Sequence, residues 1–425
     1  AARPRRCGQY AWAGMLLAGL FALLIMPLAG ASSLIFGWMG HAANVRAMES
    51  LYFRYMVLAV PLTLASRVLE GFFYGLHRPG VVVTASLVAN GFNILGNWVL
   101  IFGRIGFPAM GLEGAAIATV ASWGLQLAIL LGVFLRPRLR QFGTHHLRLV
   151  KVRQCRDILR IGWPAGFQFM MDVFTWAIFN ALLIARFGTG HLAAATAVIR
   201  YLTLSFMPAV GVSIATSALV GRHIGAGRPD LARRRAHAAV ATAMVYMGAC
   251  GVIFMVWRHW LVEQFLVAVP PEAAGAGEPA ETMPVEQMVA IGGRLMICAA
   301  VFQLFDAVGI VFSGALRGAG DTLWPMVVTI AMSFGVLVGG GYAMVRFLPG
   351  LESLGPYIAA TVYVCLLGVF MAWRFESGAW QRIDLLGRRP VGEPTPIPAG
   401  TAQGPETRPD GDLPPAPEGD DGPQP

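Results

Sequence analysis

Long apolar runs alternate with short polar segments along most of the chain. Each run is close to the roughly 20 residues that a helix needs to cross the hydrocarbon core of a bilayer. In lipid every backbone polar group must be satisfied within the segment, so helices are the expected structure. The pattern predicts ten spanning helices, near residues 11–30, 53–76, 81–103, 112–135, 162–186, 193–220, 237–260, 290–315, 323–346 and 355–374.

Composition places the chain among all-α polytopic membrane proteins. Hydrophobic residues make up 56% of it and charged residues 13%, and the mean hydropathy is +0.61, far from the balance of a soluble domain. The net charge of +9 does not indicate nucleic-acid binding, because the arginines lie in particular loops between helices. The five cysteines are scattered singly and no Walker motif occurs. We therefore expect no resident metal, no cofactor and no enzymatic activity.

The distribution of arginine predicts the orientation. Loops 1–9, 136–160 and 222–235 are basic and fall on the same side when the helices are counted, whereas loops 104–111 and 261–289 are poor in arginine. The positive-inside rule places the basic loops in the cytoplasm. The chain is accordingly expected to be a multi-pass protein of the cell inner membrane, with a cytoplasmic carboxy-terminal tail.

The two halves of the chain resemble each other at a separation of about 240 residues. Arg54-Tyr-Met-Val matches Arg294-Leu-Met-Ile, and Gly80 matches Gly320. Six predicted helices separate equivalent points, so both copies face the same way, as in a parallel repeat about an axis along the membrane normal. This predicts two pseudo-symmetric helical lobes, at residues 1–135 and 161–386, joined by a basic linker at 136–160. Residues 387–425, rich in Pro, Gly, Asp and Glu, are expected to form a disordered tail.

The repeat also reaches the amino terminus. The opening Ala-Arg-Pro-Arg-Arg resembles residues 227–235, which follow two helices in the second half. The first half contains four predicted helices and the second half six. We therefore expect a twelve-helix protein of which ten helices are present here, with activity belonging to the complete protein.

Few ionisable residues lie within the predicted spans, and such residues are functional candidates because charge in a bilayer is costly. Asp172 and Asp306 lie within predicted helices of the second half, and Arg67 and Glu70 share a helix face in the first. A carboxylate there could exchange a proton or bind sodium together with nearby amide oxygens. It could equally form a structural ion pair or hydrogen bond to a neighbouring helix. By the repeat, Ser66 occupies the position of Asp306.

Amide side chains accompany these carboxylates. Asn93 and Asn97 are one helical turn apart in the third predicted helix, and Gln168 and Gln303 lie near the two aspartates. Such amides could coordinate a cation or substrate, or tie helices together. Aromatic residues near the aspartates could line a pocket for organic cations, or pack against lipid and core.

At these segments the chain resembles the multidrug and toxic compound extrusion family over roughly residues 1–375. The motifs that carry the resemblance are His-Arg-Pro-Gly at 77–80, the segments at 90–103 and 106–119, Gly-Trp-Pro at 162–164, and the segments at 219–232 and 302–322. It implies twelve helices in two lobes, a central cavity, alternating access, and export of cationic amphipathic compounds driven by sodium or proton entry.

The resemblance also implies roles for individual residues. Asp172 matches an acidic position that is often Glu in the family, and Asp306 matches the aspartate of the F-Q-x-x-D pattern. Glu70 matches an acidic position of the family's fourth helix, and Asn93 and Asn97 match paired asparagines of its fifth. The acidic residue of the family's first helix has no counterpart here.

The sequence leads to a cation-coupled antiporter, driven by H⁺ or Na⁺, as the first hypothesis. Asp172, Asp306 and Glu70 are its candidate coupling residues, and its substrate or ion cavity would be lined by Asn93, Asn97, Arg67, Gln168 and Gln303. Its expected partners are small cationic substrates and membrane lipids, with the chain acting as a monomer. The alternatives are a lipid-linked saccharide flippase of related architecture, which would need several arginines facing the cavity, and a non-transporting truncated remnant.

Overall fold

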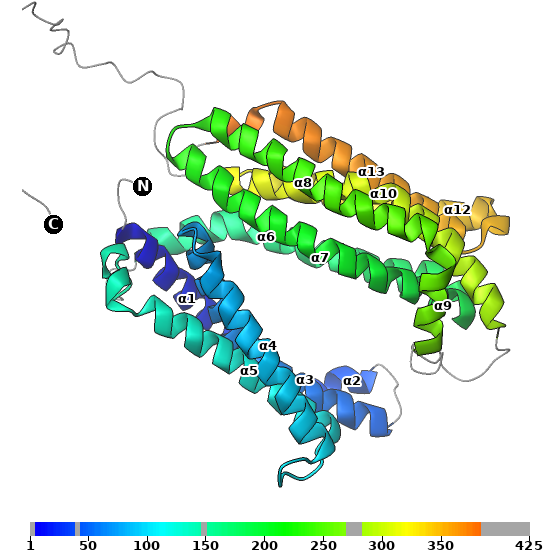
Figure 1. Ribbon diagram of the computed structural model, residues 1–425, viewed down its shortest axis with the longest axis horizontal. Helices are drawn as coiled ribbons and strands as arrows, with labels where there is room; N and C mark the ends of the chain where they lie inside the picture. Colours follow the sequence, from blue (N-terminus) through cyan, green and yellow to red (C-terminus); the bar gives the residue numbers. More distant parts are fainter. Residues whose placement is uncertain (1–4, 39–42, 146–150, 269–282, 384–425) are drawn as a thin grey trace, which may run out of the picture. The chain divides into compact units, whose positions relative to one another are not determined.

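The computed structural model describes residues 5–38, 43–145, 151–268 and 283–383, and the regular elements in these ranges are helices (Figure 1). The predicted tail at 387–425 lies outside the described residues. Ten helices in the described ranges are long and apolar enough to cross a membrane, which confirms the number predicted from the sequence. They are Cys7–Ala29, Ala43–Gly75, Pro79–Phe102, Gly111–Phe134, Val152–Phe187, Thr189–Gly225, Pro229–Val256, Val285–Ala319, Leu323–Phe347 and Leu354–Glu376.

The first half contains four long helices and several short ones. Its elements are α1 (Arg5–Ile25), η1 (Met26–Ala29), α2 (Ser32–Trp38), α3 (Ala43–Gly75), α4 (Pro79–Phe102), α5 (Gly111–Phe134) and η2 (Pro137–Phe142). In Figure 1 these are the elements coloured from blue to cyan.

The second half contains the remaining elements. They are α6 (Val152–Ile178), η4 (Phe179–Ile184), η5 (Ala185–Phe187), α7 (Thr189–Gly225), α8 (Pro229–Val256), α9 (Arg258–Ala268), α10 (Val285–Ala319), α11 (Leu323–Met332), η7 (Ser333–Gly340), α12 (Gly341–Phe347), η8 (Pro349–Leu351), α13 (Leu354–Glu376) and η9 (Ala379–Arg382).

Several helices begin earlier than the apolar pattern predicted. Helix α3 begins at Ala43 rather than near 53, α6 at Val152 rather than near 162, and α8 at Pro229 rather than near 237. These first turns are polar, so hydropathy does not detect them, although backbone hydrogen bonding continues through them. A proline at the first position fixes the start of α8, because it needs no backbone donor there. The short helices α2 and α9 were not predicted.

The packing of the helices repeats between the halves. In the first half α3 packs against α1 and α5, and α4 packs against α5. In the second half α10 packs against α8 and α13, and α11 packs against α13. The short helices fit the same scheme, because α2 contacts α3 as α9 contacts α10. The contacts therefore follow the parallel repeat that the sequence indicates.

Small residues bring α7 and α10 into close contact. A Cβ atom added to Gly314 of α10 would overlap Ser213 of α7, and one added to Gly318 would overlap the backbone of Ser217. The Ser213 hydroxyl donates to the carbonyl oxygen of Ile310 at 2.7 Å. A small-xxx-small pattern on each helix thus allows the backbones to approach, as is common between membrane helices.

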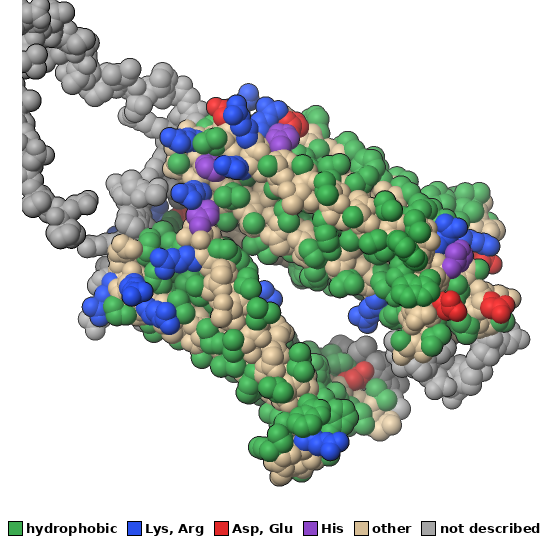
Figure 2. Space-filling model, in the orientation of Figure 1, with side chains coloured by type: hydrophobic (Ala, Val, Ile, Leu, Met, Phe, Trp, Pro, Cys, Tyr) green, Lys and Arg blue, Asp and Glu red, His purple; other side chains and the backbone are tan. Residues whose placement is uncertain are grey.

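The outer surface matches a membrane environment. Figure 2 shows hydrophobic side chains covering the sides of the helices, whereas most charged side chains gather near the helix ends. Large apolar side chains such as Leu24, Leu87 and Val245 are more than two-thirds exposed. Such a surface would be unstable in water, but lipid solvates it without cost.

Candidate functional site

The two aspartates of the second half lie close enough for their charges to interact. Asp172 comes from the last third of α6 and Asp306 from the second half of α10. The Tyr363 hydroxyl of α13 donates to Oδ1 of Asp172 at 3.3 Å, and it accepts a hydrogen bond from Ser333 at 3.1 Å. Hydrogen bonds thus join Asp172, Tyr363 and Ser333, and Asp306 of α10 interacts with Asp172 through its charge. We call these four residues the aspartate site.

Irregular helix flanks the aspartate site. The π-helical segment η7 begins at Ser333, and the π-helical segment η4 begins at Phe179, two turns beyond Asp172. π-Helical turns are rare and are often found at functional sites, because they change the direction of side chains within an otherwise regular helix. The segment η7 also contacts α6. Ser333, at the start of η7, donates to the Tyr363 hydroxyl and is thereby connected to Asp172.

The two glutamines expected near the aspartates bond to other helices. The Gln168 amide donates to Thr329 of α11 at 2.9 Å. The buried Gln303 amide donates to Ser205 of α7 at 2.8 Å, and its Oε1 atom has no hydrogen-bond partner among the described residues. Gln168 and Gln303 therefore connect helices, and neither forms a hydrogen bond to Asp172 or Asp306 in the described structure.

The paired asparagines of the first half do face each other. The Asn97 amide donates to Oδ1 of Asn93 at 3.1 Å, and the Asn93 amide points to the Thr119 hydroxyl of α5 at 3.4 Å. By the repeat these residues lie in the half that has Ser66 in place of Asp306. The buried Ser66 hydroxyl has no hydrogen-bond partner among the described residues.

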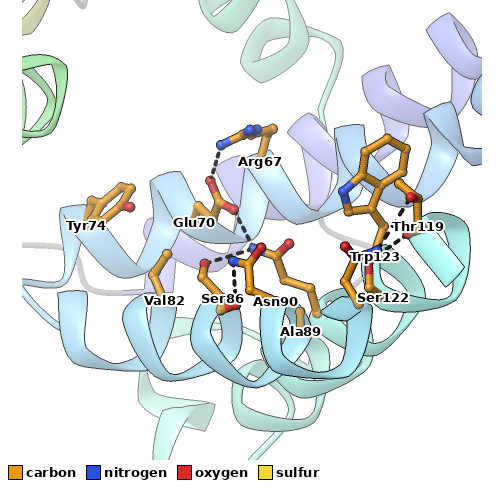
Figure 3. A pocket seen from close by; sticks show the side chains of 12 residues that line it. Arg67, Glu70, Tyr74, Val82, Ser86, Ala89, Asn90, Thr119, Ser122 and Trp123 are labelled. Carbon is orange, nitrogen blue, oxygen red and sulfur yellow. Dashed lines mark hydrogen bonds and ion pairs between the residues drawn. The ribbon is translucent and has the colours of Figure 1, made fainter. Parts of the chain in front are cut away.

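Glu70 forms a second polar cluster in the first half, shown in Figure 3. Arg67 donates to Oε2 of Glu70 at 3.0 Å, which confirms that the two residues are paired. The Gln126 amide of α5 donates to Oε1 of Glu70 at 3.0 Å and also contacts the Ser86 hydroxyl of α4 at 3.1 Å. The Glu70 carboxylate is thus held by partners from its own helix and from α5.

This cluster opens into a pocket of about 320 Å³ between α3, α4 and α5. In the view of Figure 3, Glu70 lies between the rings of Tyr74 and Trp123. The lining is mostly polar and consists of Arg67, Glu70, Tyr74, Val82, Ser86, Ala89, Asn90, Asn93, Thr119, Ser122, Trp123 and Gln126. We call it the first-lobe pocket. Asn93 also lines it, so one residue of the amide pair shares this cavity with the ion pair.

Sequence reasoning missed several members of both sites. Tyr363 and Ser333 were not singled out, and neither were Gln126 and Ser86. Gln126 carries a detectable signal, since it is an amide within an otherwise apolar span. Tyr363 and Ser333 carry none, because hydroxyl groups of this kind are common in membrane helices.

Removing the Tyr363 hydroxyl is expected to strengthen cation binding at the aspartate site, for H⁺ above all, because this hydroxyl stabilises the ionised and empty carboxylate of Asp172. The variant Tyr363→Phe keeps the ring and its packing but leaves Asp172 without this donor, and hydrogen bonds to charged groups contribute about 1.5–3 kcal/mol. The distance of 3.3 Å between the Tyr363 hydroxyl and Oδ1 of Asp172 is long, so we expect an effect at the lower end of this energy range. Isothermal titration calorimetry with Na⁺, repeated at several pH values to report on H⁺, measures the change in binding affinity. Tyr342→Phe, at an exposed position, is the matched control, and equal affinities in both variants would exclude a role for Tyr363.

Ten spanning helices in two repeated halves, with carboxylates inside the spans, define a polytopic membrane transporter. The model of the MatE family matches residues 1–99 and 164–342. Together these ranges cover more than half of the chain, so the protein belongs to the MatE family.

Curated relatives and solved structures agree with this assignment. A probable multidrug resistance protein NorM from Mesorhizobium japonicum is 29% identical over 352 residues, which cover 81% of this chain and 70% of the relative. A protein with the same description from Deinococcus radiodurans is 29% identical over 363 residues, 85% of this chain and 76% of the relative.

Two solved structures share the fold. A MOP superfamily transporter from Pyrococcus furiosus superposes with a TM-score of 0.77 at 18% identity, and the match covers 89% of this chain and 82% of that transporter's chain. That transporter is described as having a binding pocket of reversed polarity. A multidrug resistance MATE family transporter in an outward-facing conformation superposes with a TM-score of 0.75 at 18% identity, covering 88% and 80%. At these identities the likeness concerns the fold alone.

Proposed function

We propose that this protein is a cation-coupled antiporter that exports cationic amphipathic compounds by alternating access. The observation that carries the proposal is the aspartate site, in which two carboxylates share a polar cluster inside the spanning helices α6 and α10. Two negative charges that interact in this way repel each other, and a bound cation or proton relieves this repulsion. Such a site favours uptake of H⁺ or Na⁺.

Coupling follows from the competition for these carboxylates. When Asp172 and Asp306 are empty and ionised, they attract an organic cation that enters between the helices. When an external H⁺ or Na⁺ occupies the aspartate site, that attraction is lost and the organic cation is released. A ligand shifts a conformational equilibrium only by its different affinity for the two states, so ion and substrate must favour opposite-facing states.

The relatives support the substrate class, since those reported above are described as probable multidrug resistance proteins. The basic segments at 136–160 and 222–235 support a cytoplasmic location for the corresponding helix ends. The proposal therefore has the protein in the cell inner membrane, moving substrates from the cytoplasm outwards. Glu70 stays a predicted coupling residue, although in the structure its charge is balanced by Arg67.

Reconstitution tests this proposal directly. The full chain is placed in proteoliposomes loaded with a fluorescent lipophilic cation, and inward H⁺ and Na⁺ gradients are imposed separately. Efflux driven by at least one gradient, and abolished by its collapse with an ionophore, is the expected result. Efflux that ignores both gradients would contradict cation coupling, and flipping of fluorescent lipid without cation efflux would favour the flippase alternative.

A further inference from the structure

The short turn η2, which follows α5, is anchored in the core of the first half. Residues three apart lie on the same side of a 3₁₀ helix, and in η2 these are Leu139 and Phe142. Leu139 is fully buried among the residues around Phe134, and Phe142 packs against the same core. The turn therefore has a fixed inner side, and its remaining side chains are directed away from the core.

The chain that follows η2 is held against α1. Gly143 ends the turn with a φ of 78°, a left-handed conformation that suits glycine. It packs so closely on Gly8 of α1 that a Cβ atom added to Gly8 would overlap its backbone. The indole of Trp12, also in α1, donates to the carbonyl oxygen of Thr144 at 2.8 Å. Two independent contacts thus fix the end of the turn, and its shape is set before any ligand arrives.

Three arginines alternate along this fixed turn. Arg136, Arg138 and Arg140 are exposed, and none of them forms an ion pair or a side-chain hydrogen bond with another residue in the described part of the chain. The surrounding segment 136–160 contains seven arginines and one lysine but a single acidic residue, Asp157. The Asp157 carboxylate already accepts a hydrogen bond from Tyr10 at 2.8 Å. The turn is therefore a rigid cationic surface without a counter-ion among the described side chains.

The position of η2 along the chain places these charges at the edge of the bilayer. The spanning helix α5 ends at Phe134, and Arg136 follows two residues later. Leu135, between them, is 40% exposed. Figure 2 shows Lys and Arg side chains gathered at the end of the first half from which η2 leaves α5. Apolar and basic side chains thus adjoin, as they do where acyl chains meet headgroups.

We propose that η2, with Arg136, Arg138 and Arg140, is a docking surface for the phosphate headgroups of anionic phospholipids in the cytoplasmic leaflet. A guanidinium presents its donors in a planar fork that matches two phosphate oxygens, and basic segments beside a membrane helix attract anionic lipids. The exposed Leu135 contacts the first part of the acyl chains. The inference rests on the cytoplasmic orientation within the proposed function, but not on antiport.

Native mass spectrometry of the full chain, titrated with phosphatidylglycerol in detergent, tests the proposal because it resolves successive lipid adducts. The variant Arg136→Gln/Arg138→Gln/Arg140→Gln is expected to bind the first phosphatidylglycerol about tenfold more weakly or worse, since each basic residue beside an anionic lipid contributes severalfold. Phosphatidylcholine with the same acyl chains should bind weakly and alike to both proteins. Soluble glycerol phosphate should not displace the lipid, and displacement at millimolar concentration would identify a site for soluble phosphate and overturn the proposal.

Two further variants control for charge and for folding. Arg228→Gln/Arg234→Gln/Arg235→Gln removes the same charge from exposed arginines at the start of α8, and it should change the affinity by less than about twofold. An equal loss in both triple variants would show unspecific attraction and contradict a docking surface at η2. Lysine at positions 136, 138 and 140 keeps the charge and should restore the affinity to within about threefold. Lysine variants that bind as weakly as the glutamine variants would exclude the electrostatic basis.

Lipid binding and transport are measured separately, so the two proposals can fail separately. Phosphatidylglycerol binding needs no gradient, whereas efflux of the lipophilic cation does. If gradient-driven efflux is present but the glutamine variant at η2 binds phosphatidylglycerol as the parent does, only the docking surface is wrong. If that variant loses the lipid while the parent shows no gradient-driven efflux, antiport is wrong and the docking surface stands.

Discussion

Replacing Asp306 with asparagine is expected to reduce ion-driven efflux to the background of empty proteoliposomes, a loss of more than about tenfold. Asparagine keeps the size of the side chain and one oxygen, but it can neither ionise nor exchange a proton. Asp172→Asn is expected to have the same effect, because the two carboxylates belong to one cluster. Efflux from proteoliposomes under the driving gradient, normalised to the amount of reconstituted protein, is the measurement.

The control for these variants is Asp230→Asn, the same change at an exposed position in the first turn of α8. It should leave efflux unchanged. Size-exclusion chromatography of the solubilised variants shows whether each one is still produced and folded. If Asp172→Asn and Asp306→Asn both keep full efflux, the aspartate site does not couple the ion to transport.

The second large effect concerns the contact between α7 and α10. Gly314→Ala and Gly318→Ala are each expected to destabilise the protein by about 1–3 kcal/mol, because the added methyl group overlaps the backbone of α7. Helix propensity alone predicts the opposite sign, since alanine stabilises a helix by about 1 kcal/mol relative to glycine. A lower midpoint in thermal or denaturant unfolding of the solubilised protein would therefore report the close packing itself.

Gly211→Ala supplies the comparison for these glycines. Gly211 lies in α7, the partner of α10 in this contact, and a Cβ atom added there meets no neighbouring atom within 4 Å. Its unfolding midpoint should stay the same or rise. A midpoint that falls equally in Gly211→Ala and Gly314→Ala would show that the loss comes from glycine itself and not from the α7–α10 contact.

The number of spans was predictable because the hydrophobic signal is strong and local. The starts of α3 and α6 were not, because their first turns are polar and hydropathy measures only the hydrocarbon part of a helix. The pairing of Arg67 with Glu70 was also predictable, since three residues bring both onto one helix face.

The partners of the carboxylates could not be predicted in the same way. The contact from Tyr363 to Asp172 joins residues 191 positions apart, and the contact from Gln126 to Glu70 joins residues 56 apart. Such pairs depend on which helices pack together and on how each is rotated. Gln303 shows the risk of judging by proximity in sequence, because it lies one turn from Asp306 yet bonds Ser205 on α7.

The unequal charge of the two sites has a consequence for membrane voltage. The Arg67–Glu70 pair sums to zero, whereas Asp172 and Asp306 together carry up to two negative charges. An electric field across the bilayer acts on each charge with about 2.3 kcal/mol per 100 mV over the full thickness. The aspartate site is therefore pulled towards the positive side when it is empty and feels no net force when two monovalent cations fill it. Voltage would thus bias the movement of the second lobe before ion binding but not after it, and exert no net force on the paired charges of the first.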